Sequence, residues 1–178
     1  MALHHDLLEQ AAHLATREPK KPRQASLRRA VSAAYYAVFH LLVADGANRL
    51  APANPAGLRP LIQRAFDHGD MRAVCRGFAE GHKAAIRNHQ PGNPPPATRT
   101  LVTLPLDARL YAVAQAFVDL QEARHDADYN VTKQWNRLDV LNHVQTARQA
   151  FADWAAVRGT PDAAVFVVAL LLQKHWGR

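Results

Sequence analysis

The chain has 178 residues, of which 48% are hydrophobic, so its length and composition suit one domain with a core of ordinary size. Its single cysteine, Cys75, excludes an internal disulfide and a cysteine-rich zinc site, and we expect a cytoplasmic protein. Lysine and arginine outnumber acidic residues by 22 to 15, and this net charge of +7 favours polyanionic partners, although a codon bias toward arginine would give the same excess.

We expect neither a secretion signal nor a membrane-spanning segment. Residues 1–6 lack the basic leader and apolar stretch that begin a signal sequence. The longest apolar run, Ala163–Leu172, is about half as long as the roughly 20 residues that cross a bilayer. We therefore predict that this run forms a buried helix.

Residues that favour helices dominate the chain, and clusters of β-branched residues are scarce. We predict an all-α fold, an up-and-down bundle of about five to seven helices in a single domain over residues 1–178. Its core is expected over about 23–158, followed by a C-terminal helix over about 160–175. The predicted helices are, in chain order, Asp6–Thr16, Arg23–Ala44, Leu58–Asp67, Asp70–Ile86, Asp107–Asp128, Trp135–Val157 and Pro161–His175. Two of them carry apolar residues at helical spacing, which predicts a stripe that faces the core. The stripes are Leu110, Val113, Phe117 and Leu120 in the fifth helix, and Leu138, Leu141, Val144, Ala147, Phe151 and Trp154 in the sixth.

Proline, glycine and capping residues predict the breaks between these helices. We expect the second helix to end before Gly46 and a loop to occupy 51–57. Residues 88–96 contain four prolines and cannot continue a helix, so they are predicted to form an exposed loop or linker of unassigned role. Asp107 and Thr160 are predicted to be N-caps of the helices that follow them.

The second predicted helix carries a polar stripe formed by Arg29, Ser32, Tyr36 and His40. Their spacing of three, four and four residues places them on one helix face. Such a stripe could line a polar binding cleft, or it could be a solvated surface with Tyr36 half buried. The spacing alone does not choose between these alternatives.

The long helix ends in an unusual group of charged residues. Arg124 and Asp128 are four residues apart and can form an ion pair. Asp126 and Asp128 lie near the helix C-terminus, where anions oppose the helix dipole. This group could be a functional site, or it could be a salt bridge at a helix end with Tyr129 covering the core.

The segments Ser32–His40 and Ala123–Tyr129 together resemble two motifs of the HEPN superfamily of helical-bundle proteins. The resemblance is strongest to a branch whose helix end reads Arg-x-x-Ala-Asp-Tyr, and it covers about Leu27 to Phe151. It implies a core of four or five helices, and a homodimer in which two copies of the late motif face one another. Many members are metal-independent ribonucleases, toxins of toxin–antitoxin pairs or RNA-binding domains.

Catalytic members of the family carry an arginine followed, after four to six residues, by a histidine. Arginine binds the scissile phosphate through its planar fork, and histidine moves the proton of the ribose 2′-hydroxyl. In this chain Tyr129, Asn130 and Val131 stand where that histidine would follow Arg124. Tyrosine has a reference pKa of about 10 and is a poor base at neutral pH. His125 and His40 are possible substitutes.

The expected function is therefore that of an RNA-associated protein, a toxin-type or degenerate ribonuclease that contacts phosphate through Arg124 and orients it with Asp128 and Tyr129. No cofactor is expected, and the implied partners are RNA and a cognate antitoxin or nucleotidyltransferase-like protein. The alternatives are a non-catalytic dimeric interaction module and a bundle that binds a small ligand or nucleotide. The expected cleft is lined by Arg29, Ser32, Tyr36, His40 and Asn130.

A metal site is not expected, because the histidines lack the spacing of metal ligands. His82, His89 and Cys75 could in principle gather around a metal ion, but the loop that contains His89 makes this arrangement unfavourable. The three tryptophans are predicted to be packing anchors rather than platforms for stacking bases. These tryptophans are Trp135, Trp154 and Trp176.

Overall fold

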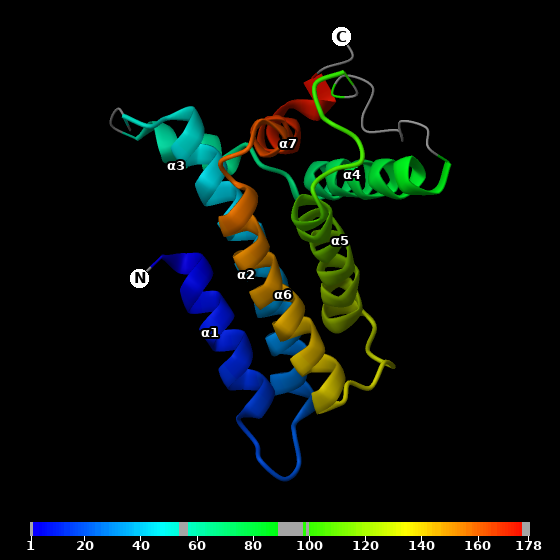
Figure 1. Cartoon of the computed structure of the whole chain (residues 1–178). Helices are drawn as coiled ribbons and strands as arrows, with labels where there is room; N and C mark the ends of the chain where they lie inside the picture. The colour runs from blue at the N-terminus through cyan, green and yellow to red at the C-terminus, as the bar shows by residue number, and fades with distance from the viewer. Residues whose placement is uncertain (1, 54–56, 89–97, 99, 176–178) are drawn as a thin grey trace. The chain divides into compact units, whose positions relative to one another are not determined.

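The computed structural model describes residues 2–53, 57–88, 98 and 100–175, and in these ranges it contains helices and no strand (Figure 1). The prediction of an all-α bundle with five to seven helices is confirmed. The described helices are α1 (Leu3–Thr16), α2 (Gln24–Leu50), α3 (Leu58–Arg64), α4 (His68–Asn88), α5 (Ala108–Tyr129), α6 (Arg137–Val157), α7 (Pro161–Leu172) and the 3-10 helix η1 (Gln173–His175).

The described residues fall into two compact units, each with its own core. Unit 1 comprises residues 1–41 and 116–152, and unit 2 comprises residues 42–115 and 153–178. The long helices α2, α5 and α6 each contribute residues to both units. The expected single domain over residues 1–178 stays a prediction.

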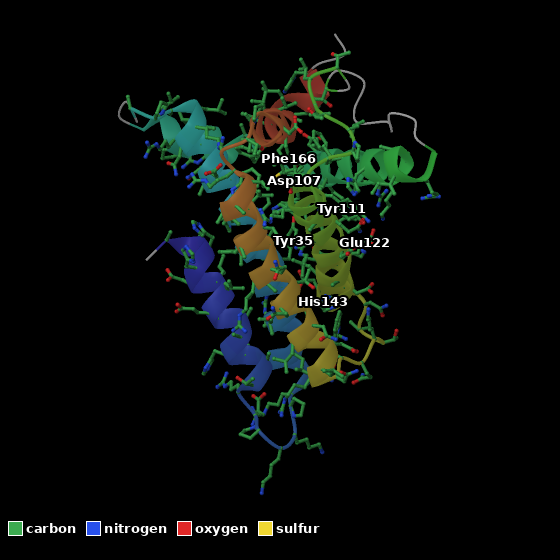
Figure 2. The ribbon with its side chains drawn as sticks, viewed as in Figure 1. Tyr35, Asp107, Tyr111, Glu122, His143 and Phe166 are labelled. Atoms are coloured by element: carbon green, nitrogen blue, oxygen red, sulfur yellow. The ribbon has the colours of Figure 1, made fainter. Side chains whose placement is uncertain are left out.

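The core of unit 1 forms where the apolar stripes of its helices meet. Tyr35 on α2, labelled in Figure 2, is 1% exposed and packs edge to face against Phe117 on α5, with ring centroids 5.5 Å apart. Leu27 and Leu120 are also fully buried in the same unit. In α6 the predicted stripe is wrong at its first member, because Leu138 is 68% exposed.

The core of unit 2 is built on aromatic side chains. Phe166, labelled in Figure 2, packs against Phe78 and Trp154, with ring centroids 5.0 and 6.1 Å away. Asp45 is buried and forms ion pairs with Arg49 and Arg158, so its charge is compensated. The expectation that Trp154 is a packing anchor is confirmed by its 1% exposure.

Gly46 does not end α2, and the helix continues six residues beyond the predicted limit at Ala44. The reason is a close approach of neighbouring side chains. A Cβ atom on Gly46 would lie 2.7 Å from Cζ of Phe66 and 3.2 Å from Cγ1 of Val167. Glycine at this position therefore admits neighbouring side chains rather than turning the backbone.

Gly46→Ala is expected to destabilise unit 2, although alanine in a helix interior normally gains about 1 kcal/mol over glycine. The added methyl group overlaps the buried ring of Phe66, and such overpacking costs roughly 1–3 kcal/mol. Chemical denaturation of the wild type and the variant measures the difference. Restoration of stability in the double variant Gly46→Ala, Phe66→Leu would confirm the cause, whereas a more stable single variant would contradict it.

The two predicted N-caps are confirmed. The Asp107 carboxylate accepts a hydrogen bond from the backbone N–H of Arg109 at 2.8 Å, and the Thr160 hydroxyl accepts one from Ala163 at 3.2 Å. Of the predicted loop at 88–96, residue 88 is the last of α4 and the remainder lies outside the described residues.

One described helix, α2, has the length and hydropathy of a membrane span, and 78% of its apolar window is buried in the structure. Core helices of soluble proteins and N-terminal signal sequences meet the same criterion. The finding therefore has little weight, and the expected absence of a membrane segment stays a prediction.

Candidate functional site

The two motifs singled out in the sequence meet within unit 1, where α2 faces α5. On α2, Ser32 and Tyr36 are one helical turn apart, and on α5 so are Arg124 and Asp128. The Ser32 hydroxyl donates a hydrogen bond to Oδ1 of Asp128 at 2.6 Å, and Nη2 of Arg124 donates one to the Tyr36 hydroxyl at 3.1 Å. Four polar side chains are thus joined in one network by bonds that span 96 and 88 residues of the chain.

Asp128 connects the two halves of this network. Nε of Arg124 lies 2.7 Å from Oδ2 of Asp128, in an ion pair without hydrogen-bond alignment, since Nε has no hydrogen-bond partner. The two side chains are 24% and 21% exposed. A carboxylate that accepts from Ser32 with one oxygen and faces Arg124 with the other fixes the position of the guanidinium.

Two tyrosine rings complete the surroundings of Arg124. Its Cζ atom lies 5.5 Å from the ring centroids of both Tyr36 and Tyr129, within the range of cation–π attraction. Burial lowers the pKa of Arg124, but the oxygens of Tyr36, Asp128 and Tyr129 raise it by more, so the guanidinium stays charged. Nη1 of Arg124 makes no hydrogen bond with any described residue and is not among the buried unpaired atoms.

Arg28, which the sequence reasoning passed over, holds the C-terminal end of α5. Its Nη1 donates to the carbonyl of Ala127 at 2.8 Å, and its Nη2 donates to the carbonyls of Asn130 and Lys133 at 3.0 and 2.6 Å. A cation at the carbonyl end of a helix also offsets the helix dipole. Arg28 therefore compensates for the acidic residues that the sequence places at this helix end.

The signal for Arg28 is a spacing of four. Arg28, Ser32, Tyr36 and His40 follow one another at steps of four residues, whereas the predicted stripe began at Arg29 with a step of three. Because arginine occupies both positions, residue type could not distinguish them. The structure leaves Arg29 exposed and buries Arg28 in part.

An open pocket of about 490 Å³ lies between α1 and the first half of α2, which run alongside each other in Figure 1. Three residues of the predicted cleft, Arg29, Ser32 and Tyr36, line it from α2. The α1 wall was not predicted, because the expected cleft was formed by residues of the second helix and by Asn130. The lining residues are Leu7, Gln10, Leu14, Arg17, Ala25, Ser26, Arg29, Ser32, Ala33 and Tyr36.

Asn130 belongs to the turn after α5 and does not line this pocket. Its side-chain oxygen accepts hydrogen bonds from the backbone N–H groups of Thr132 and Lys133 at 3.3 and 3.2 Å, and from the Thr132 hydroxyl at 2.8 Å. Lys133 in turn pairs with Asp126 at 2.8 Å. Asn130 is thus engaged in shaping the turn.

Both candidate histidines are linked to Arg124 through a tyrosine. The His40 ring stacks on Tyr36 with centroids 6.3 Å apart, and the exposed His125 ring lies 5.1 Å from that of Tyr129. Each tyrosine also faces the guanidinium of Arg124. Two ring pairs therefore adjoin Arg124, Tyr36 with His40 and Tyr129 with His125.

Neither a family model, nor a curated protein, nor a solved structure matches this chain. The geometry of the Arg124 network and the adjoining pocket is therefore the basis for a functional conclusion.

The described residues contain no group of three or more histidine, cysteine, aspartate or glutamate side chains that could hold a metal ion. Cys75 is fully buried, and burial raises the pKa of its thiol well above the usual value. His82 is buried and stacks on Tyr111, with ring centroids 4.3 Å apart (Tyr111 is labelled in Figure 2). His89 and Trp176 lie outside the described residues.

Two histidines in unit 1 have lowered pKa values. Burial lowers the pKa of His4, and the neighbouring His5 and His40 lower it further. Burial also lowers the pKa of His143, labelled in Figure 2, and the charge of Lys133 adds to this effect. The folded state therefore disfavours protonation at both positions.

Acidification is expected to destabilise unit 1. The folded chain binds fewer protons at His4 and His143 than the unfolded chain, whose histidines titrate near pH 6.5. Stability should fall as pH drops from about 6.5 to the lowered folded pKa values of the two histidines. Thermal melting across this range measures the fall, which should be shallower in His143→Gln. A melting temperature that stays constant or rises on acidification would contradict this expectation.

Proposed function

We propose that this chain is a HEPN-like RNA-associated protein in which Arg124 binds a backbone phosphate. The observation that carries the proposal is the state of the guanidinium. Asp128 and the Tyr36 hydroxyl hold two of its nitrogens, while Nη1 has no hydrogen-bond partner among the described residues. A guanidinium held in this way loses little side-chain entropy when it binds a phosphate oxygen.

The surroundings of Arg124 support a polyanionic ligand. The chain carries a net charge of +7, and phosphate contacts by arginine contribute much of the affinity of proteins for nucleic acids. Tyr129 is 62% exposed beside the guanidinium, so its ring is available to stack on a base.

We propose RNA binding rather than cleavage. The chain would then be a degenerate relative of the ribonucleases that the resemblance implies. A general base must lie within hydrogen-bond reach of the 2′-hydroxyl whose proton it removes. Tyr129 occupies the first place where a catalytic histidine would follow Arg124, so the imidazole that would serve as the base is missing there. His40 and His125 contact Tyr36 and Tyr129, and an RNA-cleavage assay on the wild type tests whether either can act.

Arg124→Ala is expected to weaken binding of single-stranded RNA about tenfold or more. Loss of a charge-assisted hydrogen bond costs about 1.5–3 kcal/mol, and 1.4 kcal/mol corresponds to a factor of ten in affinity. Fluorescence anisotropy with labelled RNA measures the change, and circular dichroism checks that the helices remain.

The matched control is Arg148→Ala, which removes the same charge from an exposed position on α6 in the same unit. We expect this variant to bind nearly as the wild type does. Equal affinities for the wild type and Arg124→Ala, with the helices intact, would refute the assignment of Arg124.

A second candidate function is a dimeric interaction module, favoured by the apolar side chains around the α5–α6 turn. Tyr129, Val131 and Leu138 are 62%, 81% and 68% exposed, which is unusual for large apolar residues placed near one another in sequence. Sedimentation of the wild type and of Leu138→Ser tests it. A dimer that the substitution dissociates supports the module, and a monomer at all concentrations contradicts it.

A further inference from the structure

We infer that the pocket between α1 and α2 binds a nucleoside phosphate, with the phosphate between Arg17 and Arg29 and the base on the apolar wall. The inference rests on the proposed function where the nucleotide is one unit of an RNA strand. It extends that proposal to a second set of residues, and to a helix that the sequence motifs do not include.

Two cations line this pocket, one from each helix, and we assign the phosphate to them. Arg17 comes from the end of α1 and is 61% exposed, and Arg29 comes from α2 and is exposed. Arg29 makes no hydrogen bond or ion pair with any described residue. The lining contains two arginines and no acidic residue, so it favours an anion.

Two acidic residues are bonded to the pocket lining, Asp128 through Ser32 and Glu18 through Ser26, and both are already engaged. Glu18 accepts hydrogen bonds from the Ser26 hydroxyl at 2.9 Å and from the backbone N–H of Arg23 at 3.4 Å. Its nearest approach to Arg17 is 3.9 Å, which is a weak contact at an exposed site. Burial raises the pKa of Glu18, but these hydrogen bonds and the charges of Arg17 and Arg23 together lower it by more. Arg17 thus keeps capacity for a phosphate.

The connection between the two helices adds to the positive field. The segment 17–29 contains Glu18 as its single acid, and Arg28 is engaged with the carbonyls after α5. Five basic residues remain for solvent or ligand. These are Arg17, Lys20, Lys21, Arg23 and Arg29.

The rest of the pocket suits a flat organic group. Leu7 and Leu14 are half-buried on one face of α1, and Tyr36 lines the pocket from α2. Gln10 supplies an amide that can both donate and accept. A volume of about 490 Å³ falls within the range of about 300–1,000 Å³ found for small-molecule sites. Inorganic phosphate would fill a small part of it.

The pocket and the Arg124 network share two residues. Ser32 lines the pocket and bonds to Asp128, and Tyr36 lines it and bonds to Arg124. All of these residues belong to unit 1. A strand whose phosphate lies at Arg124 can therefore place a neighbouring nucleotide in the pocket.

The test measures three probes against the intact protein: AMP, inorganic phosphate and a short uridylate oligonucleotide. Binding is followed by calorimetry for the first two and by anisotropy for the third. The variants are Arg17→Ala, Arg29→Ala and Ala25→Phe, which adds a ring at an exposed position in the pocket lining. Arg148→Ala is the charge control, and Arg124→Ala separates this pocket from the proposed phosphate site.

We expect AMP to bind more tightly than inorganic phosphate, and each of the three pocket variants to weaken AMP about tenfold. Arg124→Ala should weaken AMP binding less than the pocket variants do, since Arg124 meets the pocket only through its hydrogen bond to Tyr36. If only the oligonucleotide binds and the pocket variants weaken it, the nucleotide enters as part of a strand, and the inference holds.

Two results would overturn the inference. One is oligonucleotide binding that Arg124→Ala weakens while Arg17→Ala, Arg29→Ala and Ala25→Phe leave it unchanged, which would retain the proposed function and remove the pocket. The other is AMP bound no more tightly than phosphate and insensitive to Ala25→Phe. A third result separates the two claims. If the pocket variants weaken AMP binding while Arg124→Ala leaves RNA affinity unchanged, the proposed function is wrong and the nucleotide site in the pocket is retained.

Discussion

Arg28→Ala is expected to lower the free energy of unfolding by about 2–4 kcal/mol, a larger effect than most surface substitutions have. The guanidinium donates to the carbonyls of Ala127, Asn130 and Lys133, which lie at and just after the end of α5. Without it these carbonyls lose their donor, and the carboxylates in the last turn lose a compensating cation.

The neighbouring arginine provides a matched control for this prediction. Arg29→Ala removes the same side chain from an exposed position with no described hydrogen bond, so a change within about 0.5 kcal/mol is expected. Urea denaturation of the two variants and the wild type measures both effects. Equal losses in the two variants would show that Arg28 has no special role at the end of α5.

Phe117→Ala is expected to cost about 3–5 kcal/mol, the usual range for removing a buried aromatic ring. Phe117 is fully buried and meets the Tyr35 ring edge to face at 5.5 Å. The helices of unit 1 that carry the candidate site pack around this pair. Such a loss is comparable to much of the stability of a domain of this size.

Leu138→Ala is the control for the core prediction, because Leu138 is an apolar residue of the same unit that is 68% exposed. Its loss should change stability by less than about 0.5 kcal/mol. Thermal and urea unfolding of both variants provide the comparison. A Phe117→Ala variant as stable as Leu138→Ala would contradict the packing described for unit 1.

Helix periodicity and capping chemistry predicted most of the fold. The stripe of Leu110, Val113, Phe117 and Leu120 is fully buried as its spacing indicated, and Thr160 caps α7 as its residue type indicated. These features depend on neighbours within one turn of helix. Local sequence contains that information in full.

The features that sequence reasoning missed depend on residues distant in the chain. Gly46 was interpreted as a helix end, because its role is set by Phe66 and Val167 rather than by its own helix. Leu138 was assigned to a buried stripe, but it is exposed, and spacing within α6 could not show what lies opposite it. Tertiary contacts override local propensity at such positions.

The candidate site shows the same division. The pairing of Arg124 with Asp128 follows from their spacing of four and was predicted. The bond from Arg124 to Tyr36 required α2 and α5 to lie together, and only the resemblance of the two segments to paired motifs suggested it. The α1 wall of the pocket had no signal in either motif, since Arg17 and Leu14 lie outside both.

The salt dependence of RNA affinity tests the central claim most directly, because it reports phosphate contacts rather than affinity as a whole. For a single strand, each lost contact lowers the slope of log Kd against log salt by about 0.7. We expect Arg124→Ala to lower the slope by about this amount and Arg148→Ala to leave it unchanged. A slope in Arg124→Ala equal to that of the wild type would contradict the assignment of Arg124 as the phosphate-binding residue.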